Sequence, residues 1–202
     1  FLCHTLQAAL ALQAGLCEVA LIVYASNQRS ALGKLQTSVS GSWSVYEAPY
    51  EARFPVSSYA LCASRDMHQY GTTREHLAHV AVSARQWAQR NPQASVREPL
   101  SIADVLAAPP VSSPLGKLDC CLVSDGAAAV LMTRADRARD LRRPPVYLLG
   151  GASAHWHKAV SSMPDLCETA ARDTGARALA MAGVSLADID VVQLYDAFTI
   201  NT

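Results

Sequence analysis

Two kinds of hydrophobic spacing follow one another along the chain, and together they predict helices and strands. Near the start, apolar residues recur every three or four positions from Leu2 onward, so we expect a helix over residues 1–15 that ends at Gly15. The next run, Val19 to Tyr24, is continuously apolar and rich in β-branched side chains, which is typical of a strand covered on both faces. A helix, a short turn and a buried strand predict an α/β layer.

The middle of the chain has a different pattern. From Ala25 to about Pro114 we expect a long, loop-rich excursion with a function or a small subdomain of its own, because residues 31–60 are rich in Gly, Ser, Pro and aromatic side chains without clean periodicity. Inside the excursion, residues 73–90 have the spacing of one amphipathic helix, which Thr72 and Glu75 open as a capping box. A short helix opened by Ser-x-x-Asp is expected over residues 101–106.

Short apolar runs dominate the rest of the chain. They predict two strands within residues 119–133 around a turn at 124–126, and further strands at 145–149 and 189–194. A short charged helix (134–141), an Ala-rich helix (164–182) closed by Gly183, and a turn at 185–188 lie between them. The helix-to-strand order of the first 24 residues recurs weakly at 165–195, which indicates two similar halves.

Composition narrows the class of protein. The chain has 202 residues, of which 50% are hydrophobic and 17% charged, which is a globular composition. Lys plus Arg (17) balances Asp plus Glu (17), so no basic field favours nucleic acid or an anionic membrane surface. The opening residues lack a signal-peptide pattern, and no apolar run approaches the ~20 residues of a membrane helix, so we expect a soluble, cytoplasmic protein.

The six cysteines, at positions 3, 17, 62, 120, 121 and 167, include no CxxC pair. Most lie in apolar runs, so we interpret them as buried reduced thiols rather than a zinc or disulfide framework. We also expect no metal site, because the His-x-His at His155 and His157 has no evident third ligand.

Four segments, in order, resemble the thiolase superfamily. LQAGLCEVALIVYAS resembles the passage that follows the thiolase nucleophile helix, and QYGTTREHLAHVA resembles a segment of the thiolase loop domain. SDGAAAVLMT resembles the hairpin that ends the first half, and ALAMAGVSLADIDVVQLYDAFT resembles a passage of the second half. Two of these motifs have variants in this chain: Tyr-Asp-Ala-Phe-Thr and Met-His-Gln-Tyr-Gly-Thr-Thr. These variants resemble the sterol-carrier-protein and lipid-transfer-protein-like branch, near the bacterial steroid side-chain aldolases.

The resemblance implies a five-layer α-β-α-β-α fold built from two duplicated halves, of which this chain would hold an internal piece. Residues 1–30 would end the first half, and 31–116 would form the loop domain. Residues 117–143 would add the last strands of the first half, and 144–202 would start the second half. A piece of this length would lack catalytic loops of the family, so we expect it to be inactive alone.

The resemblance also implies where the chemistry lies. The nucleophilic cysteine of a thiolase would fall just before Phe1, and Cys3 is either a displaced nucleophile or a buried packing residue. Where ordinary thiolases have an Asn that serves an oxyanion hole, this chain has Tyr195, either a general acid/base or a packing residue at a strand end. Asp196 replaces the motif's Glu and either orients neighbouring groups or caps the following helix.

Three residues are candidates for substrate binding. Tyr70 takes the place of a Met that walls the thiolase acyl pocket, and either reshapes that pocket or packs the loop domain. His155 follows a strand and a Gly-Gly turn, where α/β folds place ligand groups, and is either a substrate-facing group or a surface or structural histidine of the loop. His68 is a candidate for approaching the coenzyme A chain.

The function implied is carbon–carbon bond formation or cleavage next to a coenzyme A thioester. It would be either acetyl transfer, as in an acetyl-CoA acetyltransferase, or Tyr-assisted retro-aldol cleavage of a β-hydroxyacyl-CoA. The alternative is a non-catalytic acyl-CoA or lipid-binding protein, or a scaffold subunit. We expect no tightly bound cofactor apart from coenzyme A in the substrate, a homodimer, and, for an aldolase, a small zinc-ribbon and OB-fold acyl-CoA-binding partner.

Overall fold

The computed structural model describes residues 2–32, 45, 48–157 and 159–202, and the chain divides into two compact units. The first comprises 1–35, 123–156 and 168–192, and the second 36–122, 157–167 and 193–202. The helices are α1 (Leu2–Gln13), α2 (Gln28–Leu32), α3 (Val56–Tyr70), α4 (Arg74–Arg90), α5 (Ile102–Ala107), α6 (Ala135–Ala138) and α7 (Ala171–Ala182). The strands are β1 (Val19–Ser26), β2 (Pro110–Ser112), β3 (Leu115–Gly116) and β4 (Gly126–Thr133). Short 3-10 turns are η1 (Ala48–Tyr50), η2 (Lys117–Asp119), η3 (Val160–Ser162), η4 (Leu186–Asp188) and η5 (Thr199–Asn201).

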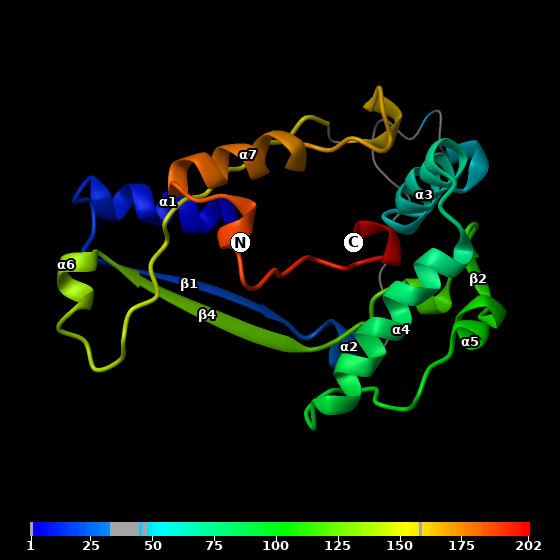
Figure 1. The fold of residues 1–202 in the computed structure, drawn as a ribbon, viewed down its shortest axis with the longest axis horizontal. Coiled ribbons are helices and arrows are strands. Elements are labelled where there is room, and N and C mark those ends of the chain that lie inside the picture. Colours follow the sequence, from blue (N-terminus) through cyan, green and yellow to red (C-terminus); the bar gives the residue numbers. More distant parts are fainter. Residues whose placement is uncertain (1, 33–44, 46–47, 158) are drawn as a thin grey trace. The chain divides into compact units, whose positions relative to one another are not determined.

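The first unit is built on an antiparallel pair, β1 with β4, which remains in register from Val19 opposite Thr133 to Ser26 opposite Gly126 (Figure 1). Helix α1 contacts both strands. Gly15 closes α1 as predicted, in a left-handed conformation (φ 71°) that costs a glycine little.

The prediction that β1 is covered on both faces is wrong for the described part of the chain. Only Ile22 is buried in β1, while Leu21 is 64% exposed and Val23 61% exposed. One short helix and one partner strand are too little structure to cover an eight-residue strand. The apolar run correctly predicted a strand, but its burial needs more neighbours than these.

Helix α7 packs closely on the segment that precedes it. A Cβ on Gly150 would lie 2.5 Å from the Ala178 carbonyl oxygen and 2.7 Å from the Ala182 nitrogen, so only a glycine fits against this helix backbone. Gly183 ends α7 in the left-handed region (φ 68°), as predicted, although the helix begins at Ala171 rather than at 164. The Gly-Gly turn therefore has a packing role within the first unit.

The second unit surrounds a small apolar core. Helices α3 and α4 both contact η5 near the end of the chain, drawn in red in Figure 1. Their buried side chains form one cluster with β3 and the C-terminal segment: Val56, Ala60, Ala63, Leu77, Leu115, Ala197 and Phe198. Helix α3 lies where only an irregular excursion was predicted. Residues 33–44 and 46–47 of that excursion lie outside the described residues.

The caps of α4 and α5 show how local chemistry sets helix starts. Helix α4 matches the predicted 73–90 closely, but its capping box uses Thr73 and His76 rather than Thr72 and Glu75. His76 Nδ1 accepts the Thr73 N–H at 3.2 Å, a role that the Thr-x-x-Glu pattern assigned to a carboxylate. The Ser101 and Asp104 box of α5 is confirmed.

Three predicted strands are wrong in the described structure. Residues 145–149 and 189–194 have no strand ladder, and Val146 is 98% exposed. Of the two strands predicted in 119–133, only β4 forms; Asp119 instead ends η2, and Cys120 makes an isolated antiparallel bridge to Phe198. An apolar run reports a tendency to be buried, but a strand also needs a hydrogen-bonded neighbour.

Among the described residues, no helix is both long and apolar enough to cross a membrane. All six cysteines are free thiols. No group of three or more His, Cys, Asp or Glu side chains in the described ranges is arranged to hold a metal ion.

Candidate functional site

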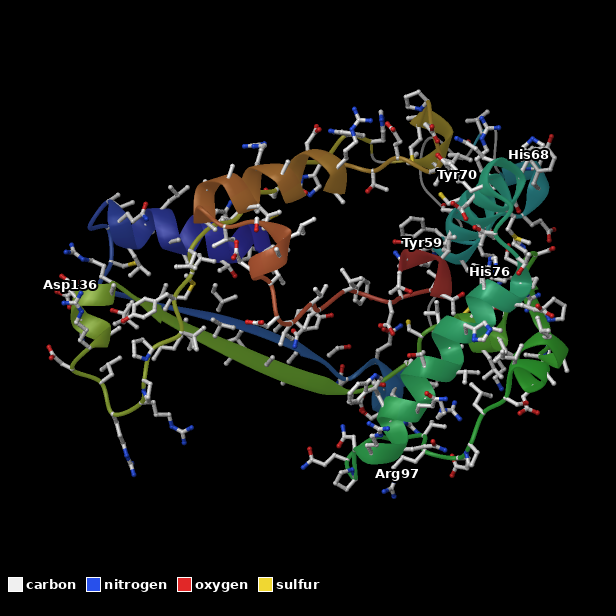
Figure 2. All side chains as sticks on the ribbon, viewed as in Figure 1. Tyr59, His68, Tyr70, His76, Arg97 and Asp136 are labelled. Atoms are coloured by element: carbon white, nitrogen blue, oxygen red, sulfur yellow. The ribbon has the colours of Figure 1, made fainter. Side chains whose placement is uncertain are left out.

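The segment that contains Tyr195 is fixed to the second unit just after that residue. The Cys121 N–H donates to the Ala197 carbonyl at 2.9 Å, and the Phe198 ring is buried against Tyr59, with centroids 4.5 Å apart. Tyr59 lies beside η5 in Figure 2. The chain is therefore anchored from Ala197 onward, and the two preceding residues, Tyr195 and Asp196, are exposed.

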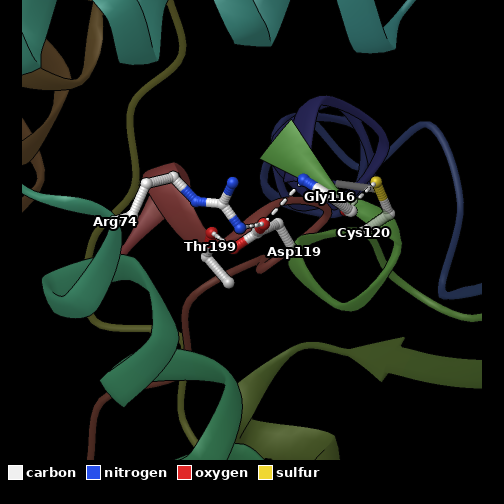
Figure 3. A network of polar contacts seen from close by, with 5 residues as sticks. All are labelled: Arg74, Gly116, Asp119, Cys120 and Thr199. Carbon is white, nitrogen blue, oxygen red and sulfur yellow. Dashed lines mark hydrogen bonds and ion pairs between the residues drawn. The ribbon is translucent and has the colours of Figure 1, made fainter. Parts of the chain in front are cut away.

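The buried carboxylate of Asp119 also fixes this C-terminal segment, through a contact with η5. Asp119 is 2% exposed, and its Oδ1 accepts a hydrogen bond from Thr199 Oγ1 at 3.0 Å. Its Oδ2 accepts the Gly116 N–H at 2.7 Å and an Arg74 guanidinium N–H at 3.2 Å (Figure 3). One carboxyl group thus joins β3, the first turn of α4 and η5.

The guanidinium of Arg74 makes this burial electrostatically tolerable. Its side chain is 30% exposed, so the positive charge keeps contact with solvent while one nitrogen pairs with Asp119. A buried carboxylate without such partners would be strongly unfavourable. In the described part of the chain, Arg74 Nε is buried without a hydrogen-bond partner. The guanidinium therefore contacts the network through its terminal nitrogen.

Cys120 is the thiol next to this network, and its surroundings disfavour a thiolate. Burial, with the nearby Asp119 carboxylate and the neighbouring Cys121, raises its pKa to about 11. Its Sγ donates toward the Gly116 carbonyl oxygen at 3.4 Å. Burial also raises the pKa of Cys62 and of Cys167. A nucleophilic cysteine needs the opposite shift, so these three thiols are unsuited to that role.

The structure excludes one of the two roles considered for Asp196, the capping of the helical turn that follows it. The cap position of η5 is Phe198, whose N–H donates to Asn201 Oδ1 at 3.1 Å, so Asp196 does not cap this turn. Its exposed carboxylate makes no hydrogen bond or ion pair to the described residues. Tyr195 does not pack at the end of a strand, because 189–194 has no ladder, and its side chain is 80% exposed.

His68 and Tyr70 share the last turn of α3, where both are exposed (Figure 2). The Tyr70 hydroxyl accepts a hydrogen bond from Gln69 Nε2 at 3.0 Å. Ala63, farther back in α3, belongs to the core cluster with Phe198. At 1.5 Å per residue, Tyr70 lies about 10 Å farther along the helix axis than Ala63. The α3 pair is therefore held at a distance from the part of the helix that contacts the anchor.

His155 belongs to the first compact unit and is exposed, whereas Tyr195, Asp196, Tyr70 and His68 belong to the second. Sequence analysis missed the network of Arg74, Asp119 and Thr199. Its one visible signal was a lone acidic residue inside the apolar LDCCLV run, since a charge in such a run needs partners when it is buried.

The comparisons with known proteins agree with this architecture. A family model described as "Thiolase C-terminal domain-like" matches residues 152–202. An acetyl-CoA acetyltransferase of Methanothermobacter thermautotrophicus is 40% identical over 77% of this chain and 41% of its own length. A steroid side-chain-cleaving aldolase of Thermomonospora curvata is 30% identical over 98% of this chain and 54% of its own length. The solved structure of an Ltp2-ChsH2(DUF35) aldolase superposes with a TM-score of 0.86 at 32% identity, covering 98% of this chain and 53% of that one.

The chain belongs to the thiolase superfamily and has a thiolase-like α/β fold. Within the superfamily it lies in the branch that contains sterol-carrier-protein-like thiolases and steroid side-chain aldolases. The chain spans about half the length of the curated relatives it matches.

Proposed function

We propose that the whole protein acts on acyl-CoA thioesters and cleaves a carbon–carbon bond by retro-aldol chemistry, with Tyr195 as the group that moves the proton. The observation that carries the proposal is the exposed phenol at 195, which stands two residues before the anchored backbone at Ala197. Such a side chain can reach a ligand while its backbone stays fixed. Likeness to an aldolase over 98% of the chain supports the same class of reaction.

The chemistry balances without an added reagent. The β-hydroxyl of a β-hydroxyacyl-CoA loses its proton as a new carbonyl forms, and the bond between the α and β carbons breaks. The electron pair of that bond moves into the thioester as an enolate, and a proton returns to the α carbon. A phenol beside these atoms can accept the first proton or supply the second, provided that it is within hydrogen-bond reach.

Acetyl transfer is the second candidate, favoured by the 40% identity to an acetyl-CoA acetyltransferase. It needs a thiolate, and the raised pKa values of Cys62, Cys120 and Cys167 argue against those thiols. Cys3, the second residue of α1 and half-buried, stays a candidate. A nucleophile elsewhere in the whole protein would serve the same reaction.

Substrate and partner proposals extend the same account. We infer that His68 and Tyr70 contact the acyl-CoA, because both are exposed on one turn of the second unit. Their separation from the anchor suits a ligand as long as an acyl-CoA. His155 and Asp196 are further candidates for substrate binding and catalysis, respectively. The aldolase structure that this chain resembles also carries ChsH2(DUF35) in its name, which supports a partner protein. We propose a small acyl-CoA-binding protein for this part, and we also expect a homodimer.

The test is product analysis with the whole protein, assayed alone and after co-expression with such a partner. We expect a β-hydroxyacyl-CoA to give a shorter acyl-CoA and a carbonyl compound without added coenzyme A. Cleavage of acetoacetyl-CoA that requires added coenzyme A, with no retro-aldol product, would support acetyl transfer instead. Binding of acyl-CoA with neither reaction would contradict both and favour a binding or scaffold role.

A further inference from the structure

The buried polar network of Asp119 and Thr199 lies next to the C-terminal segment that contains Tyr195. Among the residues whose burial is described, Asp119 and Thr199 are the buried polar or charged ones, and they hydrogen-bond directly to each other. They are 80 positions apart in the sequence. Their bond therefore connects η2 with the end of the chain.

A core that served stability alone would not require this arrangement. Burying a carboxylate costs free energy that its partners must offset, and an apolar pair of similar volume often stabilises equally well. What hydrogen bonds add is direction, because donor and acceptor must meet within a narrow range of distance and angle. Asp119 uses both oxygens, so its carboxyl plane is set by Gly116 on one side and Thr199 on the other.

Tyr195 is close enough in the sequence to the anchored residues for the position of its backbone to depend on them. Thr199 follows Phe198 and Ala197, which are both buried, and the Ala197 carbonyl accepts the Cys121 N–H. Tyr195 is two residues before that contact. An extended chain advances at most about 3.5 Å per residue, so its Cα lies within about 7 Å of an anchored one.

We propose that Asp119 and Thr199 are positioning residues for Tyr195, an inference that rests on the proposed function of that tyrosine. Their hydrogen bond holds Thr199, and together with the hydrogen bond from the Cys121 N–H to the Ala197 carbonyl it fixes the backbone from Ala197 to Thr199, which limits where the phenol can reach. Catalysis is sensitive to such placement, since a displacement of 1 Å can lower a rate about 100-fold.

The test is a double-mutant cycle in the whole protein, which combines Thr199→Val with Tyr195→Phe. Valine matches threonine in shape but cannot donate to Asp119. We expect Thr199→Val to lower kcat per folded molecule about 10- to 100-fold with a smaller change in KM. In the Tyr195→Phe background the same change should have almost no further effect, because the group it positions is already gone.

Thr199→Ser is the matched control, since it keeps the hydroxyl and should restore most of the activity. Thr199→Ala is a second variant without a hydroxyl, and the folded fraction of each is measured by near-ultraviolet circular dichroism. Normal kcat per folded molecule in Thr199→Val, equal losses in both backgrounds, or failure of both hydroxyl-free variants to fold would each assign the network to folding alone and overturn the inference. If Tyr195→Phe itself keeps full activity, the proposed function fails, whatever the Thr199 variants do.

Discussion

At the residue scale, the roles proposed for Tyr195 and Asp119 agree with the very different exposure of the two side chains. Tyr195 is 80% exposed, whereas Asp119 is 2% exposed and bonded to three neighbours. A reactive side chain has to be accessible to its substrate. The groups that orient it are better placed in the protein interior, because hydrogen bonds are stronger there than in water. The two residues fit these separate demands within one compact unit.

The thiol of Cys120 gives a prediction at this scale. Because burial and the nearby Asp119 carboxylate raise its pKa to about 11, the thiol should stay protonated at neutral pH. We therefore expect iodoacetamide to leave Cys120 largely unmodified at pH 7.5, with the rate rising as the pH approaches 11. Mass spectrometry of peptides after timed labelling measures this rate in the native protein.

Asp119→Asn is the companion variant, because it removes the carboxylate charge while nearly preserving side-chain volume. Labelling of Cys120 should then begin at a lower pH than in the wild type. Rapid labelling of wild-type Cys120 at pH 7.5 would show that the thiol is not held in its neutral form.

Sequence reasoning proposed Tyr195 as a site residue but missed the residues that anchor the chain next to it. The tyrosine stands at a motif position where a change of side chain is visible by resemblance. Folding alone brings together Asp119, Arg74 and Thr199. Asp119 is 45 positions from Arg74 and 80 positions from Thr199, and no local sequence pattern encodes contacts over such separations. Asp125 is a similar case: the sequence predicts only a turn at 124–126, and in the structure the Asp125 carboxylate accepts the Arg29 and Ser30 N–H groups at the start of α2.

At the element scale, α7 depends on a glycine outside the helix. A methyl group on Gly150 would collide with backbone atoms of α7, which cannot move aside as a side chain can. We expect Gly150→Ala to lower the free energy of unfolding by about 1–3 kcal/mol, as overpacking does in other cores. Chemical denaturation of the whole protein, monitored by circular dichroism, measures the change.

Gly151→Ala is the matched control for this prediction. A Cβ there would meet the end of the Leu6 side chain at 2.7 Å, and that flexible group can rotate away. It should therefore cost clearly less than Gly150→Ala. Equal effects of the two substitutions would contradict the close packing of α7 on residue 150.

Helices were predicted better than strands, for a physical reason. A helix satisfies its hydrogen bonds locally, so capping residues and periodicity nearly suffice, and α4, α5 and the end of α7 confirm this. A strand needs a partner from elsewhere in the sequence. β1 finds one in β4, but residues 145–149 and 189–194 find none in the described structure. Helix α3 was missed because no capping residue marks its start: Pro55 stands at its N-cap and makes no side-chain hydrogen bond to the helix, whereas α4 and α5 begin with capping boxes.

At the scale of the whole molecule, the chain covers 41% of the matching acetyl-CoA acetyltransferase and 54% of the matching aldolase. Apolar side chains of the first unit, such as Leu21, Val23 and Leu131, are more than half exposed. A large exposed apolar surface is normally covered by more protein. Expectations about the homodimer and about the inactivity of the isolated chain belong to this scale, and both stay predictions.

The most direct measurement of the central claim is the rate of retro-aldol cleavage by the whole protein, compared between the wild type and the Tyr195→Phe variant. The substitution removes one hydroxyl and leaves the anchored segment unchanged. We predict that kcat for a β-hydroxyacyl-CoA falls about 100- to 10,000-fold, the range of a general acid/base, while acyl-CoA binding is nearly unaltered. An unchanged kcat in the correctly folded variant would contradict the account.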